Sequence, residues 1–317
     1  MWYKRVNIAY MKLYIFTPNK GALFTPELES KLNENFDVVF YTEIKPLADH
    51  VDFLADESEK VVALDPDFFD WKFPKEQIDM MKHVKAICLQ TTSFSWIDGE
   101  YAKSKNIPVL NLRGFSQEAV AEYALMLALG VARKMALVAQ KGYVQDFVAH
   151  QGIELKGRTA GVIGLGHIGT CIANLCGGIG MNVKYWSKNT RNDAFTYSEI
   201  DELLKSADVV FIALARNDDT KKILTDELLQ TMKKEAIFVS IAGKTYNQEL
   251  VIKMVQEGKL YGYGYETDNA SPTLHTGNVY SLPALAWATK ESMELNANMW
   301  VDSMVGVSKG ELKNQVN

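Results

Sequence analysis

The sequence predicts an α/β fold made of two doubly wound parallel-sheet domains. Short β-rich runs alternate with amphipathic stretches before residue 112, and the same alternation starts again after residue 157. The chain has 317 residues, of which 47% are hydrophobic, so it is long enough to bury two separate cores.

The first domain is predicted from five strand-like runs, KLYIFT, VVFYT, VVALD, AICLQ and PVLNL. Amphipathic stretches at residues 25–32 and 74–84 lie between them. Strands that alternate with helices form a parallel sheet, because each crossover helix returns the chain to the end of the sheet where the previous strand began. Residues 1–10 precede the first run and are expected to be an N-terminal extension.

A long helix is predicted at residues 117–144, where apolar residues recur at helical spacing. Its apolar residues cover most of the circumference. A helix of this kind is buried or shared with a partner.

The second domain is predicted from the runs TAGVI, NVKYW, DVVFIAL, AIFVSI and LYGYGYE. Helices are expected between them at residues 168–176, 198–205, 225–232 and 247–256, with Ser198, Thr225 and Asn247 as N-caps. A last helix at residues 290–307 follows this domain and could return to the first.

Composition and charge exclude several classes of protein. The formal charge of −5 comes without any concentrated basic stretch, so nucleic acid is not an expected partner. No apolar run reaches the length of a membrane span, and the first residues lack the pattern of a secretory signal, so a cytoplasmic protein is expected. Three cysteines without metal-ligand spacing indicate buried thiols and no metal site.

A glycine turn joins the strand TAGVI to the following helix. Gly164, Gly166 and Gly169 form a G-x-G-x-x-G motif around Leu165, His167 and Ile168. In this context the glycines allow a tight turn, close approach of a pyrophosphate, and packing of the helix on the strand. The motif therefore predicts a Rossmann-type domain that binds a nicotinamide dinucleotide.

The end of the next strand bears on which dinucleotide is bound. Ser187 stands where an acidic residue usually bonds the adenosine ribose, and Lys188, Asn189 and Arg191 follow it. Because the acid that would repel a 2′-phosphate is absent and two cations are present, NADP(H) is the preferred cofactor and NAD(H) the alternative. Lys188 and Arg191 could also be solvated loop cations.

The chain resembles the D-isomer-specific 2-hydroxyacid dehydrogenases, in particular their glyoxylate and hydroxypyruvate reductase branch. The segments that carry the resemblance are TTSFSWID, NLRGFSQEAVAEYAL, GVIGLGHIG with GMNVKYWS, ADVVFIAL and NVYSLPALAWATKES. It implies a nucleotide domain at residues 113–290 inserted into a substrate domain of residues 11–112 and 291–317. It also implies a homodimer formed through helix 117–144.

The resemblance carries cofactor and substrate contacts onto particular residues. Glu266 stands where the family places an aspartate that faces the nicotinamide amide. Arg113 could face the substrate or bridge the domains, and Trp287 is either a wall of the cleft or part of the core. The remaining cofactor contacts are Gly164, Gly166, His167, Ile168, Gly169, Ser187, Lys188, Asn189, Arg191, Leu214, Ala215, Ile241 and Ala242, and the loop that holds the substrate carboxylate includes Thr92, Ser93 and Phe94.

The catalytic positions of the family are replaced. The family uses an arginine, and a histidine held by a glutamate; Gly243, Ala284 and Ser271 stand in their places. Alanine cannot donate a proton, so the standard mechanism cannot run at Ala284.

Two residues could substitute for the lost groups. Lys244 could take the place of the arginine, and His275 could serve as a displaced acid, although each could equally be an exposed loop residue. The tyrosines of LYGYGYE offer phenol groups, with packing as the plainer role.

Three hypotheses follow from these residues. The first is an oxidoreductase that transfers hydride between NADP(H) and a small anionic or carbonyl substrate, a 2-oxo or 2-hydroxy acid, through a non-standard site. The second is a catalytically inactive NAD(P)-binding regulatory or interaction protein. The third is a different NAD(P)-dependent reaction that needs no histidine.

Overall fold

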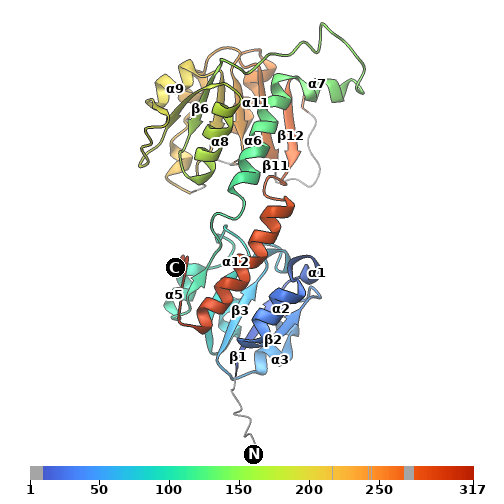
Figure 1. Ribbon diagram of the computed structural model, residues 1–317, viewed down its shortest axis with the longest axis vertical. Helices are drawn as coiled ribbons and strands as arrows, with labels where there is room; N and C mark the ends of the chain where they lie inside the picture. Colours follow the sequence, from blue (N-terminus) through green and yellow to red (C-terminus); the bar gives the residue numbers. More distant parts are fainter. Residues whose placement is uncertain (1–9, 216, 242, 244, 268–274) are drawn as a thin grey trace, which may run out of the picture. The chain divides into compact units, whose positions relative to one another are not determined.

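The computed structural model describes residues 10–215, 217–241, 243, 245–267 and 275–317. The chain divides into two compact units (Figure 1). One contains the described residues up to Phe115 together with Lys290–Asn317, and the other is Ser116–Thr289. The sequence-based division had placed the boundaries at 112/113 and 290/291.

The first unit is built on a five-stranded sheet in the order β2-β1-β3-β4-β5. Every neighbouring pair is parallel. Separate hydrophobic clusters cover its two faces, so the sheet is buried on both sides. The strands are β1 (Met11–Phe16), β2 (Phe36–Tyr41), β3 (Lys60–Leu64), β4 (Val84–Leu89) and β5 (Val109–Leu110).

Helices pack on both faces of this sheet. The last helix, α12 (Lys290–Ser308), contacts β3, β4 and the helices α1 (Lys20–Leu23) and α2 (Pro26–Asn33). The fully buried indole of Trp300 on α12 donates a hydrogen bond of 3.0 Å to the Cys88 carbonyl on β4. The other helices are α3 (Val51–Ala55), α4 (Lys75–Met80) and α5 (Gly99–Ser104), with short 3-10 turns at Leu47–Asp49 and Pro66–Phe68.

The second unit is built on a seven-stranded parallel sheet in the order β12-β11-β10-β9-β6-β7-β8. Counted within the unit this order is 3-2-1-4-5-6, plus a seventh strand, which is the order of dinucleotide-binding folds. Strands β8 and β12 were not among the predicted runs. The strands are β6 (Thr159–Ile163), β7 (Asn182–Trp186), β8 (Thr196–Tyr197), β9 (Val209–Ile212), β10 (Ile237–Ser240), β11 (Gly262–Thr267) and β12 (Val279–Pro283).

Two of the three expected N-caps of this unit are confirmed. Thr225 and Asn247 accept hydrogen bonds from the amides of Leu228 and Leu250. Ser198 is not a cap, because α9 begins one residue later after Glu199. The helices are α6 (Gln117–Ala132), α7 (Met135–Gln140), α8 (His167–Gly178), α9 (Ile200–Ser206), α10 (Asp226–Gln230) and α11 (Gln248–Gln256), with a 3-10 turn at Thr220–Lys222.

The single helix predicted at residues 117–144 is wrong in its extent. α6 ends at Ala132, and Lys134 adopts a left-handed backbone with φ of 54° before α7 begins. A continuous helix would use the Ala132 carbonyl internally. Instead that carbonyl accepts hydrogen bonds from the Ile153 amide at 2.9 Å and the Tyr261 hydroxyl at 3.2 Å. Tertiary partners therefore end the helix.

The alternation of glycine and tyrosine in β11 is explained by the helices on its two sides. A Cβ at Gly262 would lie 2.5 Å from the Val131 side chain on α6, and one at Gly264 would lie 3.2 Å from Leu127. Tyr263 and Tyr265 belong to the cluster on the opposite face. Tyr263 and Tyr265 therefore contribute to the packing of the core on that face.

The predicted fold class is confirmed, since both sheets are parallel and each carries a core on both faces. Among the described residues, every helix is too short or too polar to cross a membrane.

Candidate functional site

The predicted cofactor residues follow one row across the seven-stranded sheet. The strand register places Trp186, Ile163, Ile212, Ser240, Tyr265 and Ser281 side by side. The carboxyl ends of these strands therefore lie at one edge, where parallel α/β sheets bind ligands. The residues that come next along each strand are Ser187, Gly164, Ala213, Ile241, Glu266 and Leu282.

The glycine turn lies at the centre of this edge, between the neighbouring strands β6 and β9. Gly164 has φ of 97°, and a Cβ there would lie 2.7 Å from the Ala213 carbonyl oxygen. A Cβ at Gly169 would overlap the Gly164 carbonyl oxygen. Both positions therefore require glycine.

The amino end of α8 is open above this turn. Gly166 precedes the helix as its N-cap, and a Cβ added to it would meet no atom within 4 Å. His167 and Ile168 form the first helical residues, and His167 is exposed. Free amides at a helix N-terminus favour a phosphate group, so the turn fits the pyrophosphate of a dinucleotide.

The loop after β7 holds its two cations differently. Arg191 lies 4.0 Å from the centre of the Tyr197 ring and donates to the carbonyl oxygens of Ser187 and Thr190. Lys188 is exposed, and its Nζ lies 3.7 Å from a carboxylate oxygen of Asp219. Contacts between such exposed charges are weak, so Lys188 can turn to another anion.

Ser187 itself is nearly buried. Its side chain is 8% exposed, and its Oγ accepts a hydrogen bond from the Thr190 amide. The hydroxyl therefore shapes the loop in which Asn189 and Arg191 lie.

Glu266 lies near the β12 edge of the row. Its carboxylate accepts a hydrogen bond of 2.8 Å from the Ala286 amide in the loop after β12. Tyr123 on α6 donates to the Pro283 carbonyl in the same region, and burial, with a contribution from the Glu266 charge, raises the Tyr123 pKa to about 12. These contacts fix the segment that contains Ala284.

Ala284 is exposed directly after β12, and Trp287 in the same loop is 41% exposed. The exposure of Trp287 disfavours the core alternative. Leu214 and Ile241 are partly buried and Ala215 is exposed at the ends of their strands. Gly243 is described, whereas Ala242, Lys244 and Ser271 lie outside the described residues.

His275 lies before β12, whereas Ala284 follows that strand. Its Nε2 is 2.8 Å from the Tyr265 hydroxyl, and its carbonyl accepts a hydrogen bond from the Gln140 side chain on α7. Burial lowers the His275 pKa, which favours the neutral ring. The structure thus brings His275 to Tyr265 rather than to Glu266.

The residues predicted to bind the substrate belong to the other unit. Thr92, Ser93 and Phe94 are exposed in the loop after β4, and Arg113 is exposed after β5. Asn111, which the sequence reasoning missed, connects them, because its side chain bonds both the Thr92 carbonyl and the Arg113 guanidinium. The only signal in the sequence was its place two residues before Arg113.

Two further observations concern the possible metal ligands and a residue that the sequence reasoning missed. Among the described residues, no group of three or more His, Cys, Asp or Glu side chains is arranged to hold a metal ion. Tyr197, which stacks on Arg191, was also missed, because it belongs to the unpredicted strand β8.

Comparisons with known proteins agree with this arrangement. Residues 124–287 match the family model of the NAD binding domain of D-isomer specific 2-hydroxyacid dehydrogenases. A protein of Staphylococcus aureus (strain USA300), provisionally named a 2-hydroxyacid dehydrogenase, is 28% identical over 308 residues, which cover 92% of this chain and 96% of that protein.

Solved structures share the fold. An acyclic imino acid reductase in complex with NADPH and D-Arg superposes with a TM-score of 0.81 at 24% identity, covering 96% of this chain and 100% of that one. A glyoxylate reductase from Paecilomyes thermophila gives a TM-score of 0.81 at 21% identity, covering 96% and 98%.

Proposed function

Because the chain belongs to the D-isomer specific 2-hydroxyacid dehydrogenase family, we propose that it transfers hydride between NADP(H) and a small 2-oxo or 2-hydroxy acid or carbonyl compound through a non-standard site. The observation that carries the proposal is the row at the carboxyl edge of the seven-stranded sheet. It has the Gly164–Gly169 turn, Ile241 and Glu266 at the carboxyl ends of β6, β10 and β11, with β9 between β6 and β10. A bound nicotinamide would supply or accept the hydride.

The preference for NADP(H) rests on the loop after β7. Ser187 brings no negative charge to the strand end, and Lys188 and Arg191 are exposed beside it. Arg191 is held over Tyr197 with part of its guanidinium committed to backbone carbonyls. Among the described residues Lys188 pairs with the exposed Asp219 alone, so it is the cation that can most readily turn to a 2′-phosphate. NAD(H) is the alternative, and the dissociation constants of NADPH and NADH distinguish the two.

Proton supply is the step at which this site differs from the family pattern. Reduction of a carbonyl leaves an alkoxide that needs a proton, and the methyl group of Ala284 cannot give one. In the first candidate function, Lys244 takes the place of the arginine and His275 is the candidate acid. Lys244 stands one residue beyond the lost arginine, and the His275 ring is held by Tyr265.

A second candidate function is favoured by Ala284 itself. An iminium carbon accepts hydride while its nitrogen already carries a proton, so an imino acid needs no acid at this position. The reductase whose structure shares the fold acts on an acyclic imino acid, by its name. We therefore include 2-imino acids, formed from a 2-oxo acid and an amine, in the proposed substrate class.

The test is a turnover panel with purified protein. Glyoxylate, pyruvate, hydroxypyruvate and small aldehydes are offered with NADPH or NADH, each with and without ammonium or methylamine, and oxidation of the reduced cofactor is followed. Turnover of the oxo acids alone supports the first function, and turnover that requires the amine supports the second. Lys244→Ala should abolish the first.

The variant Ala284→His separates the two functions further. It should raise oxo-acid reduction by about tenfold or more, because general acid catalysis typically contributes at least that much. Ala284→Gln, which adds a side chain of similar size without a group that titrates near neutrality, is the matched control. No such gain is expected for the amine-dependent reaction.

The rival function is that of a catalytically inactive NAD(P)-binding protein. It is favoured if either dinucleotide binds while the whole panel, with and without amine, gives no turnover. Steady turnover that follows the protein through purification rules it out.

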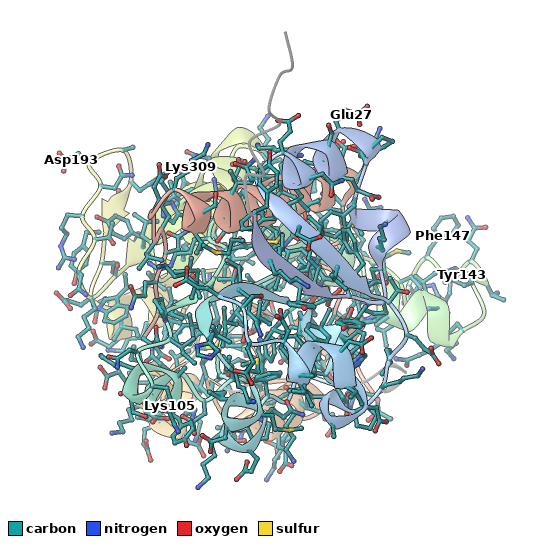
Figure 2. All side chains as sticks on the ribbon, turned by 90° about the horizontal axis from the view of Figure 1, so that it is seen from below. Glu27, Lys105, Tyr143, Phe147, Asp193 and Lys309 are labelled. Carbon is teal, nitrogen blue, oxygen red and sulfur yellow. The ribbon has the colours of Figure 1, made fainter. Side chains whose placement is uncertain are left out.

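We also propose that the protein is a homodimer through α6 and the segment after it. Met126, Leu129 and Met135 expose more than a third of their surfaces there. They line a hollow with Leu125 and Tyr280, to which the charged residues Glu122 and Arg133 also contribute. Figure 2 shows Tyr143 and Phe147 projecting at the periphery, and Phe147 is 81% exposed. Contiguous apolar surface of this kind is typical of interfaces.

A further inference from the structure

Arg113 is a cation without a carboxylate partner among the described residues of its own unit. It is the only arginine among the described residues of that unit, and its side chain is exposed. No ion pair with it is formed by the described acidic residues there. Its Nε donates a hydrogen bond of 3.3 Å to Oδ1 of Asn111. The side chain is therefore held at its base while the outer nitrogens stay available.

Asn111 ties this cation to the loop after β4. The Asn111 side chain is buried, and its Nδ2 donates a hydrogen bond of 2.7 Å to the Thr92 carbonyl. The next residue, Leu112, donates its amide to the Thr91 carbonyl at 3.1 Å. Two hydrogen bonds through one buried side chain thus fix the position of the guanidinium relative to residues 91–94.

The same loop turns its carbonyl groups into the protein. The carbonyls of Thr91, Thr92 and Ser93 accept hydrogen bonds from Leu112, Asn111 and the Trp96 indole. Within the described residues, the amides of Thr92 and Phe94 have no protein acceptor, and both residues are exposed. Because its carbonyls are satisfied while the amides of Thr92 and Phe94 are free, the loop favours an anion.

We propose that Arg113 binds the carboxylate of the substrate beside the loop amides that the family resemblance already implies, and that Asn111 is the residue that positions Arg113. The proposal rests on the proposed function, because it assumes that the ligand is a small 2-oxo or 2-imino acid. A guanidinium suits this task because its planar fork can donate two parallel hydrogen bonds to a carboxylate.

The test measures anion binding apart from turnover. Oxamate, an unreactive analogue of a 2-oxo acid, is titrated calorimetrically into the full-length protein, with and without saturating NADPH, at low and high salt. The variants are Arg113→Gln, Arg113→Lys and Asn111→Ala. Lys103→Gln is the matched control, since it removes one exposed positive charge from α5 of the same unit.

Arg113→Gln should weaken oxamate binding by about tenfold or more and flatten its salt dependence, because a charge-assisted hydrogen bond is lost. Arg113→Lys should fall between wild type and Arg113→Gln. Asn111→Ala should weaken binding while its salt dependence remains, since the charge stays. NADPH affinity and the melting temperature of Arg113→Gln should match those of Lys103→Gln.

Each contrary result has a separate meaning. Oxamate affinity of Arg113→Gln within twofold of wild type, or no oxamate binding by wild type, overturns the anion site. A lowered melting temperature with unchanged oxamate affinity would instead make Arg113 a bridging residue. If wild type binds oxamate through Arg113 but turns over nothing in the panel, the proposed reaction fails and the anion site stands.

Discussion

The carboxylate of Glu266 accepts a hydrogen bond of 2.8 Å from the amide of Ala286. This bond joins the end of β11 to the loop after β12, where Ala284 lies. Glu266 therefore has a structural role in this loop, in addition to its proposed contact with the nicotinamide amide.

Replacing Glu266 separates these two roles. Glu266→Ala should loosen the loop and weaken dinucleotide binding by about tenfold, as expected from the loss of one or two hydrogen bonds to a charged group. Glu266→Gln keeps an oxygen acceptor for Ala286 and should weaken binding less. Hydrogen exchange at residues 284–287 reports the loop, and calorimetry reports the cofactor. Equal exchange in wild type and Glu266→Ala would contradict the role assigned to this bond.

Gly169→Ala should abolish dinucleotide binding. Its Cβ would overlap the Gly164 carbonyl, so the helix and the turn must move apart. Gly177→Ala lies on the same helix where a Cβ meets no atom within 4 Å, and it should leave binding unchanged and stabilise the protein by up to about 1 kcal/mol. Calorimetric titration and urea unfolding measure both effects. NADPH binding by Gly169→Ala at wild-type affinity would refute the packing argument.

Ser187→Asp should shift cofactor preference from NADPH toward NADH. A carboxylate at this strand end repels a 2′-phosphate and can accept a hydrogen bond from a ribose hydroxyl. The ratio of the two dissociation constants should change by about tenfold or more. Ser187→Asn, which has the same size and no charge, is the control. An unchanged ratio in Ser187→Asp would place the 2′-position away from this residue.

Acid should destabilise the protein partly through His50. This ring is 7% exposed among Phe16, Tyr41 and Phe68, and its Nε2 has no partner among the described residues. Burial lowers the pKa of His50 below its usual value of 6.5. The neutral ring is therefore favoured by folding, and its contribution is complete above pH 6.5 and lost as the pH falls through the folded-state pKa.

His50→Phe should consequently reduce the difference between the urea midpoints measured at pH 7.5 and pH 5.5. His83→Asn, at an exposed position with a left-handed backbone that asparagine tolerates, is the control. The same midpoint difference in His50→Phe and wild type would assign the acid sensitivity to other groups.

Leu129→Asp should convert the proposed dimer to a monomer. Leu129 is 42% exposed on α6, and a buried, unpaired carboxylate at an interface is strongly unfavourable. Leu295→Asp is matched to it, because Leu295 is 44% exposed on α12 in the other unit. Sedimentation equilibrium measures the mass of each. A wild-type monomer, or a dimer that survives Leu129→Asp, would contradict the interface.

Much of the fold could be read from the sequence because parallel strands that are buried on both faces form short, nearly continuous apolar runs. The run TAGVI predicts β6, and the glycines after it predict the turn, since only glycine adopts φ of 97° at Gly164 without strain. Strand β8, at Thr196–Tyr197, escaped prediction because two residues carry no period.

The same distinction between local sequence and tertiary structure applies to the candidate site. The sequence by itself determined the glycine turn, the serine at the end of the NVKYW strand and the alanine at position 284, because each identity is a local property of the chain, and it predicts cofactor and catalytic positions for them. Only the tertiary structure decided where α6 stops, that Glu266 bonds Ala286, that His275 bonds Tyr265, and that Asn111 connects Arg113 to Thr92. These are hydrogen bonds between segments that sheet register and packing bring together, and no periodicity along the chain encodes them.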